Sequence, residues 1–180
     1  GSKCTECDPG NFCPIGSNSQ ITCPVGHYCP AGSFAPSLCE PGTYTITTGK
    51  ISCDKCGDTG YTCDGYTKTI CPVGHYCPSS ASPPVPCEEG KYQDLIGQTE
   101  CKTDVADGFY CPPGAIECHL CPAGQYCTGG RKRPCSGTKY SEEEGRKVDC
   151  DLDCPKGHYC PGSTSSPFPC PPGWYQDSIA

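Results

Sequence analysis

The sequence has very few of the residues that build an ordinary hydrophobic core. Leu, Ile, Val and Phe together contribute 21 of the 180 residues, and the chain has one Trp and no Met. So little aliphatic surface cannot offset the conformational entropy that is lost on folding. The composition therefore excludes a conventionally packed domain unless another stabilising force is present.

Long apolar runs and excess positive charge are lacking as well. No apolar run approaches the length of a membrane span, and no segment has the pattern of a signal peptide. The net charge is −7 and the sequence pI is about 5.0, whereas nucleic-acid binders usually present a basic face. We therefore expect no nucleic-acid partner and no membrane span in this segment.

Cysteine, in contrast, is abundant. The 22 cysteines make up about 12% of the chain, a level typical of disulfide scaffolds in secreted proteins. Cross-links of this density replace a missing core and persist only in oxidising compartments, so we predict an extracellular or cell-surface location. The 23 Gly and 21 Pro would interrupt nearly every helical window. The predicted fold is a set of small disulfide-rich repeats, with short β-strands and turns and little or no helix, stacked into an elongated rod.

One short phrase is repeated along the chain. Cys-Pro-Val-Gly-His-Tyr-Cys-Pro occupies residues 71–78 and recurs with small changes at 23–30, 121–127 and 154–161. Corresponding cysteines recur at 48 residues, and a fixed period of this size indicates a repeat architecture. The predicted boundaries are repeats at 1–52 and 53–100, a repeat with permuted spacing at 101–149, and a shortened repeat at 150–180 that continues into a following segment.

Two kinds of module alternate within these repeats. The tight module reads Cys-x-x-Gly-x-Tyr-Cys. The wide module begins in the same way, but its second cysteine comes fourteen positions after the first, as at 39–53 and 87–101, or fifteen positions after it at 135–150. The Gly suits a turn with positive φ, and the Tyr is the only large side chain of most modules. We expect the Tyr ring to cover the local cystine.

The wide modules at 39–53 and 87–101 resemble those of ephrin-receptor-like cysteine-rich repeats and of tumour-necrosis-factor-receptor domains. That resemblance implies an extracellular, elongated protein built of short strands around stacked cystines. The tight phrase more closely resembles the cysteine-rich surface and flagellar-hair (mastigoneme) proteins of protists and algae. The second resemblance argues against a cytokine-receptor role.

The resemblance also implies that the wide loops close on themselves. Cys154 and Cys160 then remain between Cys150 and Cys170 and pair with each other. Closing the other modules in the same way gives Cys7–Cys13, Cys23–Cys29, Cys39–Cys53, Cys56–Cys63, Cys71–Cys77, Cys87–Cys101, Cys111–Cys118, Cys121–Cys127, Cys135–Cys150 and Cys154–Cys160. The opposite register, which begins with Cys4–Cys7, also uses every cysteine. It needs three bridges across only two intervening residues, which are usually strained, so we favour the first register.

The favoured register leaves Cys4 and Cys170 without a partner. Counted from Cys170 across a head-to-tail join, Cys4 of a following segment again lies fourteen positions away. The joined stretch also repeats the Gly-x-Tyr-Gln-Asp core of the loop at 87–101. We therefore expect an inter-segment disulfide between Cys170 and Cys4, in one period of a longer head-to-tail array. The alternative is that Gly1-Ser2 is a cloning remnant on a trimmed fragment.

Other candidate sites are weaker. The imidazoles of His27, His75 and His158 lie near cysteines, and Cys118-His119 precedes Cys121, which suggests zinc; the odd spacings favour cystines, so we predict no metal and no cofactor. No Ser, His and Asp set suggests catalysis, and we predict that the protein is not an enzyme. The charge runs at 131–133 and 142–144 are solvated faces, or they pair between neighbouring rods.

Exposed Ser, Thr and Pro runs are candidate O-glycan sites, here Ser79, Ser80, Ser82, Ser163, Thr164, Ser165 and Ser166. Taken together, the patterns predict a structural subunit of an extracellular filament or surface coat. Its copies or adjacent repeats would assemble head-to-tail and be cross-linked by disulfides. The alternative is a protein-binding module of a receptor or adhesive ectodomain.

Overall fold

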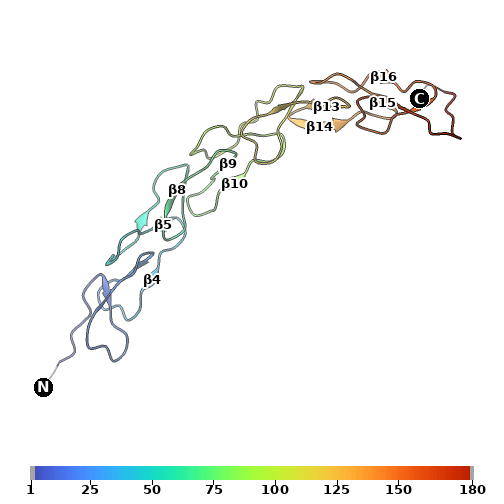
Figure 1. Cartoon of the computed structure of the whole chain (residues 1–180). Helices are drawn as coiled ribbons and strands as arrows, with labels where there is room; N and C mark the ends of the chain where they lie inside the picture. Colours follow the sequence, from blue (N-terminus) through green and yellow to red (C-terminus); the bar gives the residue numbers. More distant parts are fainter. Residues whose placement is uncertain (1–2, 179–180) are drawn as a thin grey trace. The chain divides into compact units, whose positions relative to one another are not determined.

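Residues 3–178 are described by a computed structural model, and within them the chain forms short strands and turns and no helix (Figure 1). It follows that no helix within 3–178 could cross a membrane. The chain divides into two compact units. Unit 1 comprises residues 3–85 and 95–100, and unit 2 comprises residues 86–94 and 101–178. Short strand pairs and ten disulfides confirm the predicted class of small disulfide-rich repeats.

The strands of unit 1 are two or three residues long and pair with their neighbours in sequence. Its antiparallel pairs are β1 with β2, β3 with β4, β5 with β6, and β7 with β8. β9 pairs with β10. Their bounds are β1 Asn11–Phe12, β2 Ile21–Thr22, β3 His27–Tyr28, β4 Ser37–Leu38, β5 Thr43–Tyr44, β6 Asp54–Lys55, β7 Tyr61–Cys63, β8 Lys68–Ile70, β9 His75–Tyr76 and β10 Val85–Pro86.

Unit 2 is built in the same way. Its antiparallel pairs are β11 with β12, β13 with β14, β15 with β16, and β17 with β18. The pair β13 with β14 has the longest strands, each of four residues. The bounds are β11 Phe109–Tyr110, β12 His119–Leu120, β13 Gln125–Thr128, β14 Arg131–Pro134, β15 Lys139–Tyr140, β16 Leu152–Asp153, β17 His158–Tyr159 and β18 Phe168–Pro169.

Cystines form the interior of both units. Among residues 3–178, Ala115 is the only buried apolar residue that is not a cysteine. Large apolar side chains such as Ile15, Phe34 and Val148 are exposed instead. Because the interior consists of cross-linked sulfur atoms, the chain can fold with few aliphatic residues.

Successive modules are joined by reciprocal main-chain hydrogen bonds. We number each module from its first cysteine, so that the glycine of the phrase is at position 4. The N–H of Gly10 donates to the carbonyl oxygen of Cys29, at position 7 of the next module, and the oxygen of Gly10 accepts from the N–H of Cys23. Gly42 makes the corresponding two bonds: its N–H donates to the carbonyl oxygen of Cys63, the second cysteine of the next module, and its oxygen accepts from the N–H of Cys56. In these two modules the turn therefore depends on the following module for its hydrogen bonds.

The wide modules carry a polar residue at position 7, where tight modules carry their second cysteine. Thr45, Gln93 and Ser141 occupy this position and are buried. The carbonyl oxygen of Thr45 accepts from Gly26 N–H, and that of Ser141 accepts from Gly124 N–H. Wide modules thus make the same main-chain hydrogen bond to the preceding module, although their second cysteine lies further along the sequence.

Candidate functional site

The structure places ten disulfides, five in each unit. The bridges of unit 1 are Cys7–Cys13, Cys23–Cys29, Cys39–Cys53, Cys56–Cys63 and Cys71–Cys77. Those of unit 2 are Cys87–Cys101, Cys111–Cys118, Cys121–Cys127, Cys135–Cys150 and Cys154–Cys160. These are the pairs of the favoured register. Within residues 3–178, only Cys4 and Cys170 have free thiols, and neither is buried.

The module that begins at Cys170 has the main-chain geometry of a wide module. Gly173 has a φ of +88°, and Gly42 and Gly90 of the two regular wide modules have +88° and +89°. The N–H of Trp174 donates to the oxygen of Pro171 at 3.0 Å, which closes the turn. At position 7, the oxygen of Gln176 accepts from the N–H of Gly157 at 3.0 Å. The first half of a wide loop is therefore formed here.

The aromatic side chains of this module are uncovered. Trp174 is 77% exposed and Tyr175 is 85% exposed, whereas the equivalent Tyr44 and Tyr92 are only partly exposed. Gln176 Oε1 is buried without a hydrogen-bond partner. An apolar cavity of about 360 Å³ is open here, lined by Tyr159, Cys170, Pro171, Trp174, Tyr175 and Gln176. Exposed aromatic and apolar surface of this kind is typical of sites that contact another protein.

Cys4 lies in an exposed stretch at the start of unit 1. Residues 3–6 are exposed and have no regular secondary structure. Beside them is a cavity of about 400 Å³, lined in part by Cys4, Glu6 and the Cys7–Cys13 bridge. The side chain of Gln20 braces this module, because it accepts from the N–H of Asp8 at 3.0 Å and donates to the Asp8 carboxylate at 2.8 Å.

The three histidines of the tight phrase take part in their own turns. Nδ1 of His27, His75 and His158 lies 3.0–3.1 Å from the carbonyl oxygen two residues earlier, so Nδ1 donates. Cys118 and Cys121 are in disulfides. Among residues 3–178, no three His, Cys, Asp or Glu side chains gather in a way that could hold a metal ion.

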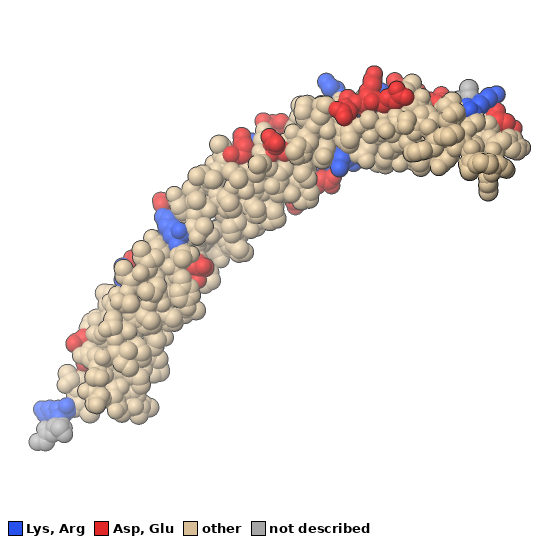
Figure 2. Space-filling view, in the orientation of Figure 1, with Lys and Arg blue, Asp and Glu red and all other residues tan. Residues whose placement is uncertain are grey.

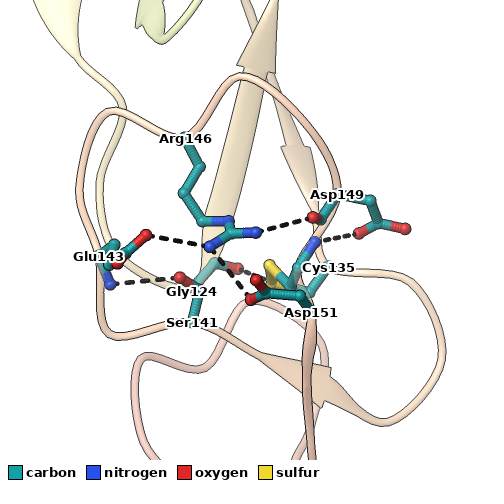
Figure 3. Close-up of polar contacts among 8 residues, drawn as sticks. Gly124, Cys135, Ser141, Glu143, Arg146, Asp149 and Asp151 are labelled. Carbon is teal, nitrogen blue, oxygen red and sulfur yellow. Dashed lines mark hydrogen bonds and ion pairs between the residues drawn. A yellow bond between two sulfur atoms is a disulfide. The ribbon is translucent and has the colours of Figure 1, made fainter.

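Acidic side chains gather in unit 2 over β15 and β16 (Figure 2). Beneath them, the Arg146 side chain is only 10% exposed and contacts Glu143 and Asp151, each at 3.1 Å. Its other terminal nitrogen donates to the carbonyl oxygen of Asp149 at 3.0 Å (Figure 3). The N–H of Glu143 donates to the buried Ser141 hydroxyl. Arg146 thus cross-links the third wide loop, residues 135–150, internally and to Asp151, which follows it.

The two charge runs are partly engaged within unit 2. Glu143 pairs with Arg146, Arg131 Nε donates to the oxygen of Glu89 at 3.3 Å, and Lys132 Nζ lies 4.3 Å from the centroid of the Tyr110 ring. These three side chains therefore have local partners within unit 2.

The pKa shifts have local causes too. The Asp64 pKa is lowered because its carboxylate accepts hydrogen bonds from the N–H groups of Thr67 and Tyr66. A 2.7 Å ion pair lowers the pKa of Asp94 and raises that of Lys102. The Asp64 shift therefore comes from a turn, and the Asp94 and Lys102 shifts come from an ion pair.

The candidate O-glycan residues differ in accessibility. Ser79, Ser163, Ser165 and Ser166 are exposed, and Ser80 and Ser82 are half-buried. Thr164 is buried, and its hydroxyl donates to the carbonyl oxygen of Ser166 at 2.6 Å. The sequence gives no sign that Thr164 differs from its neighbours.

In comparisons with known proteins, no protein-family model and no curated protein matches the chain.

Proposed function

We propose that the protein is a structural subunit of an extracellular filament or surface coat, assembled head-to-tail through a disulfide between Cys170 of one copy and Cys4 of the next. One observation carries this proposal: within residues 3–178 the two thiols outside the ten bridges belong one to each unit, and both are accessible. A chain that presents a reactive thiol at each of two different sites can be extended at both. A heterologous contact that does not close into a ring adds further copies in a row.

The bridging step is an oxidation. The thiols of Cys4 and Cys170 lose two protons and two electrons in total, and a small-molecule disulfide such as oxidised glutathione accepts them and leaves as two thiols. The compartment that maintains ten cystines supplies such an oxidant. The abundance of disulfides also supports the proposed extracellular or cell-surface location.

We propose no catalytic role. The cavity beside Cys170 is lined mainly by aromatic side chains and proline, and the shifted pKa values arise from turns and from two ion pairs. The earlier resemblance to cysteine-rich surface proteins supports the same role. O-glycans are a further proposal: if present, they attach to the exposed Ser79, Ser163, Ser165 or Ser166. Intact-mass measurement of the native protein tests this, and a mass equal to the oxidised polypeptide would remove it.

Oxidation of the purified protein with a glutathione redox buffer tests the assembly. Wild type should give a ladder of oligomers on a non-reducing gel and filaments by electron microscopy. Cys4→Ser and Cys170→Ser each remove one half of the Cys170–Cys4 bridge, so neither variant should form the ladder, and a symmetric dimer is the largest disulfide-linked product either can give. Wild type that stays monomeric with both thiols free would contradict the proposal and favour the binding-module alternative.

A further inference from the structure

We infer that Trp174 and Tyr175 form a strand that pairs antiparallel with Thr5 and Glu6 of a second copy of this chain, with Tyr175 opposite Thr5. This inference rests on the head-to-tail assembly proposed above. It adds a main-chain interface to the disulfide and fixes the register of that interface.

The internal wide modules show how such a loop is completed. Tyr44 lies opposite Asp54, and Tyr92 lies opposite Lys102; in both cases the partner directly follows the closing cysteine. Tyr92 and Lys102 exchange two main-chain hydrogen bonds, at 3.2 and 2.9 Å. The tyrosine of a wide module thus pairs with the first residue after its disulfide.

The Cys170 module lacks this completion. Its turn at Gly173 is formed, but Tyr175 has no strand partner within residues 3–178. Neither the N–H nor the oxygen of Gly173 is hydrogen-bonded within that range, whereas Gly42 bonds to both Cys56 and Cys63. One donor, one acceptor and one strand edge are therefore unfilled beside the exposed Trp174 ring.

The segment around Cys4 offers the complementary groups. Cys4-Thr5-Glu6-Cys7 has the spacing of Cys53-Asp54-Lys55-Cys56, whose two middle residues form β6. Thr5 and Glu6 are exposed and belong to no strand. Within residues 3–178, Cys7 N–H and the Cys13 oxygen have no main-chain partner.

We place this segment on the Cys170 module in the way that β6 pairs with β5. Each unpaired main-chain group then has a hydrogen-bond partner. Thr5 then exchanges two main-chain hydrogen bonds with Tyr175, as Lys102 does with Tyr92. Cys7 N–H donates to the oxygen of Gly173, and Gly173 N–H donates to the oxygen of Cys13. We take the occupant to be a second copy of this chain because its Cys4 segment supplies a partner for each of these groups, and the contact then continues the module-to-module interface already present inside each unit.

Two proline variants of the same exposed segment test the register. Thr5→Pro removes the N–H that should donate to Tyr175, whereas Glu6→Pro removes one that points away from the strand. Under the oxidation conditions above, Thr5→Pro should lower the rate of Cys4–Cys170 linkage by about five- to tenfold, equivalent to one net hydrogen bond. Glu6→Pro should stay within about twofold of wild type. Peptide mapping of the ten native disulfides checks that both variants fold.

Fluorescence of Trp174, the single tryptophan, is the second readout. Its emission should shift to the blue and become protected from acrylamide as linkage proceeds. If linkage occurs but Thr5→Pro links as fast as Glu6→Pro and Trp174 stays accessible, the strand pairing is wrong while the assembly stands. If wild type forms no linkage at all, the assembly is wrong and the pairing falls with it.

Discussion

Gly108 lies against Gly145 so closely that a Cβ atom on Gly108 would be 2.5 Å from the Gly145 carbonyl oxygen. Gly108 also has a φ of +89°, which an L side chain rarely adopts. The contact brings the turn at Gly108 onto the wide loop at 135–150, so close packing of glycine backbones contributes to stability alongside the cystines.

Gly108→Ala should therefore destabilise unit 2 strongly. We expect a loss of at least about 2 kcal/mol in the free energy of unfolding, from backbone strain and from the clash with a main-chain oxygen. Gly162→Ala is the matched control, because Gly162 has no positive φ and open space around it. Urea denaturation under non-reducing conditions measures both, and equal midpoints would refute this close-packing role.

Removing an internal cystine should be costly because both of its cysteines are core residues. Cys71 and Cys77 are buried, and replacing both with Ala should lower stability by at least about 2 kcal/mol, the chain-entropy value for a ring of this size. The Cys4→Ser, Cys170→Ser double variant also replaces two cysteines but removes no internal disulfide, so it should unfold at the wild-type denaturant concentration. A cystine deletion as mild as this control would mean that the cystines are not the core.

Arg146→Ala should loosen the third wide loop. The guanidinium bonds to two carboxylates and one carbonyl oxygen from a nearly buried position, so we expect a cost of about 1–2 kcal/mol. Amide hydrogen exchange should rise first at Cys127, whose N–H donates to the Arg146 carbonyl oxygen. Arg133→Ala, at an exposed position of β14, should change neither quantity; an equal effect there would assign the loss to net charge.

Asp149 should make this loop sensitive to acid. Its pKa is lowered because the carboxylate accepts hydrogen bonds from the Ser136 hydroxyl and N–H and from the Cys150 N–H. The folded pKa of this carboxyl lies below its unfolded value of about 3.9, so the carboxylate stabilises the fold at pH values above that value. This contribution is lost as the pH falls through the folded pKa. The stability difference between wild type and Asp149→Asn should be constant from pH 5 to 8 and shrink below about pH 4. A difference that persists unchanged to pH 2 would contradict this assignment.

Much of the fold could be predicted from cysteine spacing, because short loops between cysteines allow few geometries and because Gly and Pro exclude helices. The residues at position 7 could not be predicted in this way. Thr45 and Ser141 are polar and look like surface residues until the modules are aligned on their first cysteine. Their burial follows from hydrogen bonds to the preceding module, which depend on three-dimensional stacking.

The candidate site was likewise only partly visible in the sequence. The cysteine count identified Cys4 and Cys170, but the uncovered face of Trp174 and Tyr175 and the unfilled hydrogen-bonding groups of Gly173 appear only in the structure. The Arg146 contacts could not be predicted either, since a turn and not a regular helix or strand brings Glu143 and Asp151 to the same guanidinium. For the same reason, Thr164 could not be distinguished from its exposed neighbours.

Non-reducing peptide mapping of assembled protein tests the central claim most directly. Oligomers isolated after oxidation are digested without reduction, and the linked peptides are identified by mass spectrometry. Head-to-tail assembly predicts one linked species that joins the Cys4 peptide to the Cys170 peptide, in addition to the ten internal disulfides. Oligomers in which Cys4 and Cys170 are both recovered as free thiols would contradict it.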